Sequence, residues 1–331
     1  MSVYNGERHL SEAIESIICQ TYTEFELIII NDGSLDKTVD VIKSFSDPRI
    51  VFLENKNNIG LAASLNKGIL EAKGGYIVRM DADDVSLPNR LQLQYEFMQN
   101  NPDITVCGSS LVIYDSPDNQ WKPPCTHEEI NVRMLFECCL YHPSVIFRKD
   151  DVMDGSGGYD ATFSCSQDYD LWQRLSRVST IRFANLAEPL IRYRVYTDID
   201  RSDYKFKQKE LAKIIKNNYL KQLEIYPSAQ DYSYHQLFAC FDIKSFEITD
   251  LEKYSKWLDK IAMANDKHCI FPPFYLRQEL KYRWLKLCLL AAYQYPLVAI
   301  GFLRGDWSPY TLNSLYHFGR MIWRARKFGR F

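Results

Sequence analysis

Short apolar runs alternate with longer amphipathic stretches over the first 200 residues. The runs at 25–30 and 76–80 each end in turn-forming and acidic residues, which predicts buried strands followed by turns. Helical patterns at 9–20, 37–45 and 61–72 separate the strands. Strands joined by helices predict an α/β fold of Rossmann-like type, with a mostly parallel sheet and helices on both faces. Further strands are expected at 50–53, 105–114, 143–148, 181–186 and 190–195.

The pattern changes near residue 200. Residues 205–223, 250–264 and 274–293 have helical periodicity, and no convincing strand lies between them. We therefore predict a nucleotide-binding catalytic domain over residues 1–200 and a helical C-terminal extension over residues 201–331.

The first strand is short. Residues 2–4 lead directly into an Asn-Gly turn, whereas a buried parallel strand usually has about five or six residues. We expect the first strand to be incomplete in this chain and the true N-terminus to lie upstream of Met1.

The C-terminal end combines an apolar stretch with a basic tail. Residues 285–303 are the most apolar, but Lys286, Gln294 and Pro296 make them marginal for a spanning helix, which needs about 20 apolar residues. From Arg304 onward the chain has six basic residues and one acid, which suits an interface with anionic lipid. The alternative is a terminal helix packed on the domain with its basic residues in water. One face of this tail would carry Leu312, Leu315, Tyr316, Ile322 and Trp323.

Charge and cysteine content bear on the binding partners of the protein and on its cellular compartment. The net charge is −2, so no general basic surface indicates nucleic acid. Nine cysteines without repeated spacing, and no apolar leader at the start, favour reduced thiols in the cytoplasm. Zinc ligation by Cys125 with His127, or by Cys138 and Cys139 with His142, is an alternative that matches no tetrahedral spacing well.

Acidic residues follow two of the predicted strands. Ligands of open parallel sheets bind beyond the carboxyl ends of the strands, where Asp32, Asp81, Asp83 and Asp84 are expected. Carboxylates suit hard cations such as Mg²⁺ or Mn²⁺, which complete their shell with phosphate oxygens and water. Alternatively, Asp83 or Asp84 only caps a helix that starts near residues 88–90.

Five motifs in order give a more specific signal than any single one. They are Ser2-Val3-Tyr4-Asn5-Gly6, Asn31-Asp32-Gly33-Ser34, Asn58-Ile59-Gly60-Leu61 with Asn66-Lys67-Gly68, Asp81-Ala82-Asp83-Asp84, and Gln167-Asp168-Tyr169-Asp170-Leu171-Trp172. Over residues 1–196 this order resembles the family 2 glycosyltransferases with the GT-A fold.

The resemblance implies a role for each matched residue. Tyr4 and Asp32 would flank the nucleotide base, and the triplet Asp81-Ala82-Asp83 would bind the donor. Asp83, assisted by Asp81, would hold a divalent cation, Mg²⁺ or Mn²⁺, on the diphosphate. Asp168 would be the base that deprotonates the acceptor hydroxyl in an inverting displacement. The alternative for Asp168 is an N-cap of the helix that follows it.

Gln167 and Tyr196 depart from the family pattern. Gln167 stands where relatives often have Glu, and Tyr196 stands where many carry a histidine that reaches the metal, so a third protein ligand is in doubt. Gln167 and His142 are acceptor-side candidates. The Q-x-x-R-W signature of processive relatives is not seen, which favours addition of a single sugar.

These observations predict a metal-dependent, inverting hexosyltransferase that uses a UDP- or dTDP-sugar. A saccharide or lipid-linked saccharide at the inner face of the cell membrane would be the acceptor, in surface polysaccharide synthesis. The alternatives are a degenerate nucleotide-sugar-binding module and a sugar-nucleotidyltransferase of similar fold.

Overall fold

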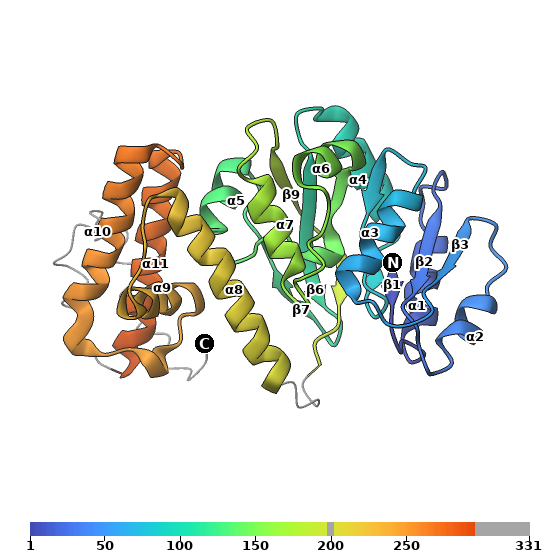
Figure 1. Cartoon of the computed structure of the whole chain (residues 1–331), viewed down its shortest axis with the longest axis horizontal. Coiled ribbons are helices and arrows are strands. Elements are labelled where there is room, and N and C mark those ends of the chain that lie inside the picture. Colours follow the sequence, from blue (N-terminus) through green and yellow to red (C-terminus); the bar gives the residue numbers. More distant parts are fainter. Residues whose placement is uncertain (197–201, 295–331) are drawn as a thin grey trace. The chain divides into compact units, whose positions relative to one another are not determined.

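A computed structural model describes residues 1–196 and 202–294 (Figure 1). The chain divides into two compact units. The first comprises Met1–Ile130 and Cys138–Ile215, and the second comprises Asn131–Glu137 and the chain from Lys216 onward. The domain boundary near residue 200 stays a prediction, because compact units need not fold independently.

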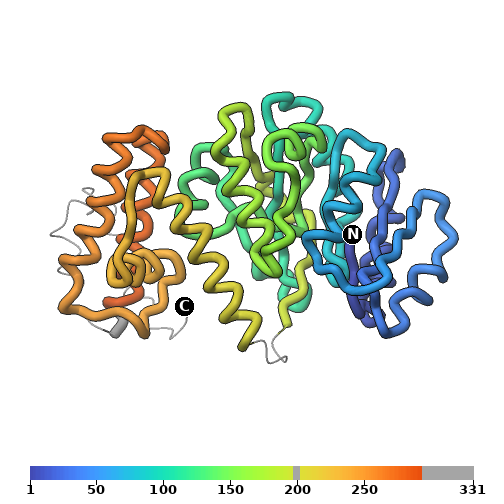
Figure 2. The backbone as a smooth tube through the Cα atoms, viewed as in Figure 1, coloured from blue at the N-terminus to red at the C-terminus, as the bar shows by residue number. Residues whose placement is uncertain are grey.

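The first unit opens with a three-stranded parallel sheet. Strands β1 (Ser2–Val3), β2 (Leu27–Asn31) and β3 (Ile50–Glu54) lie in that order, and helices α1 (Leu10–Ile18) and α2 (Thr38–Lys43) connect them. In Figure 2 the blue N-terminal part of the tube gathers in one region, as consecutive parallel βα units require. Helix α1 forms because its apolar residues recur at helical spacing and all become buried: Leu10, Ala13, Ile14 and Ile17.

The second sheet of this unit is mixed. Its strands are β4 (Tyr76–Val78), β8 (Ile146–Arg148), β6 (Val106–Ile113), β9 (Phe183–Tyr193) and β5 (Val85–Ser86) in spatial order, with β7 (Ser116–Trp121) added on β6. Only β6 and β9 pair in parallel; the other pairs are antiparallel. The α/β fold is therefore confirmed, whereas the sheet is less parallel than the pattern indicated.

Strand β9 joins two stretches that were predicted as separate strands. Its register on β6 shifts around Ser110, which lies opposite Pro189. Proline has no N–H for the ladder, so the strand continues through a local irregularity. The break in the sequence pattern at Pro189 is thus a bulge within one strand.

Five further helices begin between residues 61 and 167. They are α3 (Leu61–Glu71), α4 (Arg90–Asn100), α5 (His127–Arg133), α6 (Lys149–Ser156) and α7 (Gln167–Leu175), together with the 3₁₀ turn η1 (His142–Ser144). One core cluster takes residues from both sheets, including Val3, Ile29 and Ile191, and Ala82 packs against it. The acidic triplet is therefore anchored to the core through its central residue.

Residues 202–294, the described part of the predicted C-terminal extension, are helical, as predicted. They form α8 (Ser202–Gln222), α9 (Ala229–Cys240), α10 (Leu251–His268) and α11 (Pro273–Gln294), with 3₁₀ turns η2 (Ile243–Ser245) and η3 (Ile248–Asp250). The pattern missed α9, which starts at a capping box formed by Ser228 and Asp231. Within the second unit, buried Arg283 pairs with Glu279 at 2.7 Å and with Glu137 at 2.6 Å, which ties Asn131–Glu137 to α11.

The membrane predictions concern a different part of the chain. The basic tail and the end of the apolar stretch, residues 295–331, lie outside the described residues. Within residues 1–196 and 202–294, no helix is long and apolar enough to cross a membrane.

Candidate functional site

Two turns at the carboxyl ends of β1 and β2 are hydrogen-bonded together. The N–H of Asn5 donates to Ser34 Oγ at 2.9 Å, and the N–H of Leu35 donates to Asn5 Oδ1 at 2.8 Å. Asn5 has a positive φ of 51°, which asparagine tolerates better than most residues. Tyr4 is 47% exposed beside this turn. It is available to a ligand, and its contact with the nucleotide base stays a prediction.

Asp32 lies buried just after β2 and is surrounded by donors. Its Oδ1 accepts from Asn55 Nδ2 and from the N–H of Ile59, each at 2.9 Å, and its Oδ2 accepts from the N–H of Gly60 at 2.9 Å. Only 2% of the residue is exposed. Asp32 thus fixes the Asn58–Leu61 motif onto β2, while its predicted contact with the base is not tested by this geometry.

The second acidic group is a compact cluster after β4. One carboxylate oxygen from each of Asp81, Asp83 and Asp84 lies within 4.8 Å of the other two. Helix α4 has Asn89 as its N-cap, so Asp83 and Asp84 do not cap it. Asp84 instead accepts the N–H of Arg194 at 2.9 Å, and its Oδ2 has no partner in the described part of the chain.

Two arginines hold this cluster in place. The guanidinium of Arg79, which is 4% exposed, forms an ion pair with Asp81. Arg194 donates from Nε to the backbone carbonyl of Asp83 at 2.6 Å, and its guanidinium pairs with Glu12 and lies 3.6 Å from the ring centre of Tyr114. The arginines therefore orient Asp81 and the backbone of Asp83, and within the described residues neither Asp83 nor Asp84 forms a carboxylate ion pair with an arginine or lysine.

Burial and the neighbouring carboxylates raise the pKa values of Asp83 and Asp84. Burial, with the negative charges of Asp81 and Asp83, raises the pKa of Asp84 to about 8. Burial and Asp81 also raise the pKa of Asp83, while a hydrogen bond from the Tyr196 phenol opposes that rise. Tyr196 thus contacts Asp83 through its phenol.

A divalent cation fits these residues. Three carboxylates converge, one buried oxygen of Asp84 lacks a donor within the described residues, and the excess negative charge calls for a counter-ion. Oxygen donors suit Mg²⁺ or Mn²⁺. No cysteine–histidine group of comparable size is found among the described residues, and His127 instead accepts the N–H of Phe183, so the zinc alternative gains no support.

Asp168 lies in the first turn of α7 and not at its N-cap. Ser166 is the N-cap, with a φ of 58°. Burial raises the pKa of Asp168; the N–H of Tyr169 and the charge of Arg79 oppose the rise, and Asp81 adds to it. The thiol of Cys138 lies 3.9 Å from Asp168 Oδ2. The same arginine and the same aspartate thus act on both Asp168 and the acidic cluster.

The acceptor-side candidates lie beside this group. His142 Nε2 is 2.8 Å from the hydroxyl of Tyr159, and burial together with Arg79 lowers the pKa of His142 well below its usual value. Gln167 is the first residue of α7 and is buried. Both occupy the region of Asp168, and their contact with an acceptor stays a prediction.

Several residues of this site were not identified from the sequence. Arg79, Arg194 and Tyr159 contact or influence the acidic residues through the fold. The only sequence signal was the position of Arg79 within a strand, where a buried charge requires a partner. Nothing in the local pattern linked Arg194 or Tyr159 to the Asp81–Asp84 segment, because both are more than 70 residues away from it along the chain.

Comparison with known proteins agrees with this arrangement. The family model "Glycosyl transferase family 2" matches residues 1–165. An uncharacterized glycosyltransferase of Haemophilus influenzae is 34% identical over 289 residues, covering 81% of this chain and 85% of its own. The O-antigen biosynthesis glycosyltransferase WbnJ of Escherichia coli is 35% identical over 207 residues, covering 59% of this chain and 78% of its own.

Solved structures share the fold at low sequence identity. TarS 1-349 of S. aureus, in complex with UDP-GlcNAc, has a TM-score of 0.56 at 13% identity and covers 89% of this chain and 90% of its own. The mannosyltransferase PcManGT of Pyrobaculum calidifontis, in complex with GDP-Man and Mn²⁺, has a TM-score of 0.53 at 13% identity, covering 100% of this chain and 86% of its own. With the acidic cluster after β4 and the homology over most of its length, this chain belongs to glycosyl transferase family 2 and is a glycosyltransferase with the GT-A fold.

Proposed function

We propose that this glycosyltransferase transfers one hexose from a UDP- or dTDP-type sugar with inversion and with the help of a divalent cation. One observation carries the proposal: Asp168 is under the electrostatic influence of Asp81 and Arg79, which also form the ion pair of the acidic cluster. This supports a proton acceptor and a cation site in one region, which attack by a hydroxyl on a diphosphate-linked sugar would require.

Asp83 and Asp81 would hold the cation, with Asp84 supplying further negative charge. The cation, when bound, would neutralise charge on the nucleoside diphosphate leaving group. A neighbour of similar fold was solved with GDP-Man and Mn²⁺, and another with UDP-GlcNAc, which supports a nucleotide-sugar donor and a divalent ion.

Asp168 would accept the proton of the acceptor hydroxyl. Its raised pKa brings the carboxylate closer to the working pH, which improves a general base, while the N–H of Tyr169 keeps it oriented. A single displacement assisted by one base inverts the anomeric centre, by the same logic as an inverting glycosidase.

The acceptor is proposed to be a saccharide or lipid-linked saccharide of a surface polysaccharide. The O-antigen function named for the E. coli relative supports this class. Contact with the inner face of the membrane through residues 304–331 remains part of the proposal and rests on the sequence alone.

The decisive variant is Asp168→Asn. Turnover should fall by roughly 10²–10⁴-fold, the usual contribution of a positioned general base, while donor affinity stays nearly unchanged. Asparagine keeps the size of the side chain and can still accept the N–H of Tyr169, so the melting temperature should hardly move. Donor affinity, melting temperature and turnover are measured on the same preparation.

Asp170→Asn is the matched control, two residues along α7. Asp170 pairs with Arg174 at 2.8 Å and is buried, so its loss should lower the melting temperature and leave the turnover of the folded protein intact. Near-normal turnover in Asp168→Asn would remove Asp168 from the mechanism.

A further inference from the structure

Three aromatic side chains gather where β7 ends. The ring centre of Trp121 lies 5.9 Å from that of Tyr141 and 5.4 Å from that of Tyr193. Both tyrosines are partly buried and pack against the core cluster that contains Ile191, whereas Trp121 is 39% exposed. We call these three residues the aromatic platform, because two rings anchored on the core support an indole that is open to solvent.

The rest of β7 offers no comparable surface. Residues 116–120 are serine, proline, aspartate, asparagine and glutamine, and all six residues of the strand are exposed. Single exposed apolar residues are common on protein surfaces, so exposure alone assigns no role to Trp121. Its position relative to the acidic cluster and to Asp168 is what distinguishes it.

Tyr193 links the platform to the acidic cluster. It is the last residue of β9, and Arg194 after it donates to the backbone carbonyl of Asp83 at 2.6 Å. Burial and the negative charges of the Asp81–Asp84 segment raise the pKa of the Tyr193 phenol above its usual value. The ring of Tyr193 therefore contacts the indole, while its phenol lies within electrostatic reach of the proposed cation site.

Tyr141 links the platform to the proposed base. Three residues earlier, the thiol of Cys138 lies 3.9 Å from Asp168 Oδ2. Three residues of chain span at most about 11 Å, so the backbone of Tyr141 lies close to the segment that contacts Asp168. The carbonyl of Tyr141 also accepts the N–H of Ser144 at 2.8 Å, in the turn η1 that contains His142. The platform therefore borders the acceptor-side residues as well as the acidic cluster.

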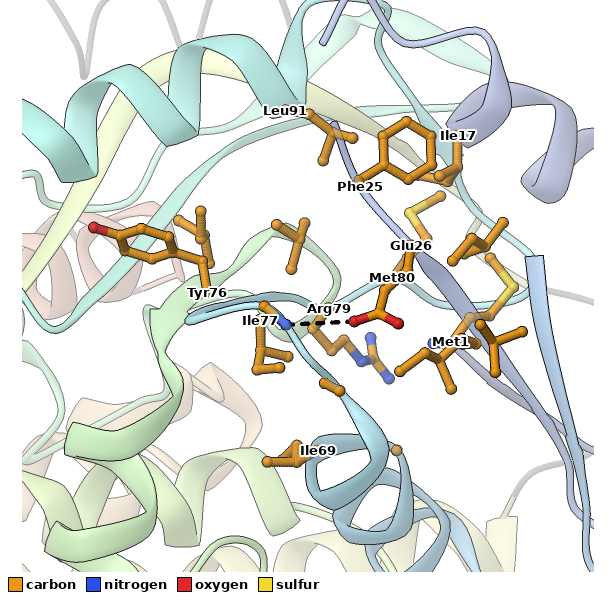
Figure 3. Close-up of a pocket in the computed structure, with 18 of the residues that line it drawn as sticks. Met1, Ile17, Phe25, Glu26, Ile69, Tyr76, Ile77, Arg79, Met80 and Leu91 are labelled. Carbon is orange, nitrogen blue, oxygen red and sulfur yellow. Dashed lines mark hydrogen bonds between the residues drawn. The ribbon is translucent and has the colours of Figure 1, made fainter. Parts of the chain in front are cut away.

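A pocket of about 880 Å³ in the first unit is less suited to a saccharide (Figure 3). Its walls include aliphatic side chains such as Ile17, Ile69 and Leu91, and Asp168 does not line it. Sugar hydroxyls would lose hydrogen bonds with water against these walls. A saccharide that reaches Asp168 is therefore expected at the exposed platform.

We propose that the aromatic platform is an acceptor subsite, in which one face of a pyranose ring of the acceptor saccharide stacks on the indole of Trp121. This role rests on the proposed function, since it takes Asp168 as the base that meets the acceptor hydroxyl. A pyranose ring has C–H groups on its faces and hydroxyl groups around its edge. A face can therefore lie on an aromatic ring while the hydroxyls stay hydrogen-bonded to water or to polar side chains.

The test measures the binding of simple pyranosides and needs no turnover. Methyl β-D-glucopyranoside and methyl β-D-galactopyranoside are titrated into the full chain and followed by saturation-transfer NMR. At least one of them should bind, with the transfer concentrated on the ring protons of one face. In Trp121→Leu its dissociation constant should rise by roughly two- to tenfold, because an apolar side chain stays but the aromatic face is lost. Trp121→Phe, which keeps a smaller aromatic face, should lose less affinity.

Two further variants separate stacking from other effects. Trp121→Met, a second side chain without a ring, should behave like Trp121→Leu and guards against a folding defect specific to leucine. Tyr226→Ala removes an aromatic side chain that is 73% exposed in the second unit, and it should leave the titration unchanged. Melting temperatures of all variants are recorded with the titrations.

Equal affinity of the unmodified protein and the two variants without a ring at position 121 would overturn the subsite. No saturation transfer to either pyranoside in the unmodified protein would overturn it as well. These readouts do not depend on the proposed chemistry, so a failure here leaves the assignment of Asp168 untouched. Conversely, normal turnover in Asp168→Asn, with pyranoside binding that still depends on Trp121, would remove the proposed base and keep a saccharide site at the platform.

Discussion

Asp32 and Asp84 follow similar strands, are almost equally buried, and have opposite electrostatic surroundings. Asp32 is 2% exposed and both of its oxygens accept hydrogen bonds, three in all. Asp84 is 1% exposed, accepts one backbone N–H, and lies against two other carboxylates. Donors of the protein itself thus surround the carboxylate of Asp32, whereas Asp84 has one such donor and two neighbouring carboxylates.

The difference separates two uses of a strand-end aspartate. A carboxylate surrounded by N–H groups is stable without a ligand and can organise loops, as Asp32 does for Asn58–Leu61. A carboxylate crowded by like charges is costly in the free protein, and a cation relieves that cost. This electrostatic cost is the reason for proposing the Asp81–Asp84 segment as the cation-binding part of the site.

The largest effect is expected from Asp83→Ala. Removing a direct ligand should weaken Mn²⁺-dependent UDP binding at least as much as the roughly 10–100-fold loss typical of outer-shell changes. The fold should survive, because Asp83 holds Arg194 through its backbone carbonyl, which alanine retains. Calorimetric titration with Mn²⁺ and UDP measures the change, and an unchanged affinity would show that the cation is held elsewhere.

Asp32→Asn tests the other side of the comparison. The amide keeps one acceptor oxygen but presents an NH₂ group to a neighbouring donor, so the variant should lose about 2 kcal/mol of unfolding free energy. Urea unfolding in the absence of metal measures this loss. An unfolding free energy equal to that of the unmodified protein would mean that the hydrogen bonds to Asn55, Ile59 and Gly60 contribute no net stability.

Asp84→Asn should change stability in the opposite direction. The pKa of Asp84 is raised to about 8, above its ordinary value of 3.8, so the folded state holds a proton that the unfolded state has lost. Metal-free stability should therefore be greatest below about pH 4 for this group and fall as the pH rises toward 8. Asparagine removes the titration and should make the metal-free protein more stable near pH 8 than the protein with Asp84.

Melting temperatures between about pH 5 and pH 8, recorded in chelator and then in Mn²⁺, check this sign. The decline with pH should be steeper in chelator than in Mn²⁺, and it should flatten in Asp84→Asn. A pH profile in the variant that matches the original would assign the decline to other groups.

Much of the fold was predictable from the sequence. Which hydrogen-bond donors and cationic side chains contact each buried carboxylate was not. Apolar runs and helical spacing located β2, β3, α1 and α3, because those elements depend on local burial patterns. The exposed strand β7 carried no apolar signal, since all six of its residues face solvent. The contrast between Asp32 and Asp84 depends on Gly60 and Arg194, which only tertiary structure brings to them.

The same limit applies to the site residues. The ordered motifs indicated Asp32 and Asp81–Asp84, because each group follows a strand at the ligand-binding edge. Asp168, in the first turn of α7, was indicated by the family resemblance. Glu12 on α1 pairs with Arg194 after β9, across 182 positions of sequence, and no local pattern could have linked them. Long-range ion pairs of this kind decide how the acids are presented.

The smallest effect is expected from Tyr196→Phe, which removes one hydrogen bond from Asp83 and keeps the ring. The phenol opposes the rise in the pKa of Asp83, so its loss should favour the protonated carboxyl and weaken cation binding. One hydrogen bond of ordinary strength, about 0.5–1.5 kcal/mol, corresponds to a loss of roughly two- to tenfold in Mn²⁺ affinity. The ring stays near His9, whose centroid lies 6.1 Å from that of Tyr196, so packing should be preserved.

The loss should be greatest at low pH, where a proton competes with the cation for Asp83, and shrink as the pH rises, because the carboxyl is then deprotonated in both proteins. A uniform loss at every pH would instead indicate that Tyr196 contacts the ion directly. The phenol oxygen would then be a neutral ligand of the cation beside the carboxylates of the Asp81–Asp84 segment.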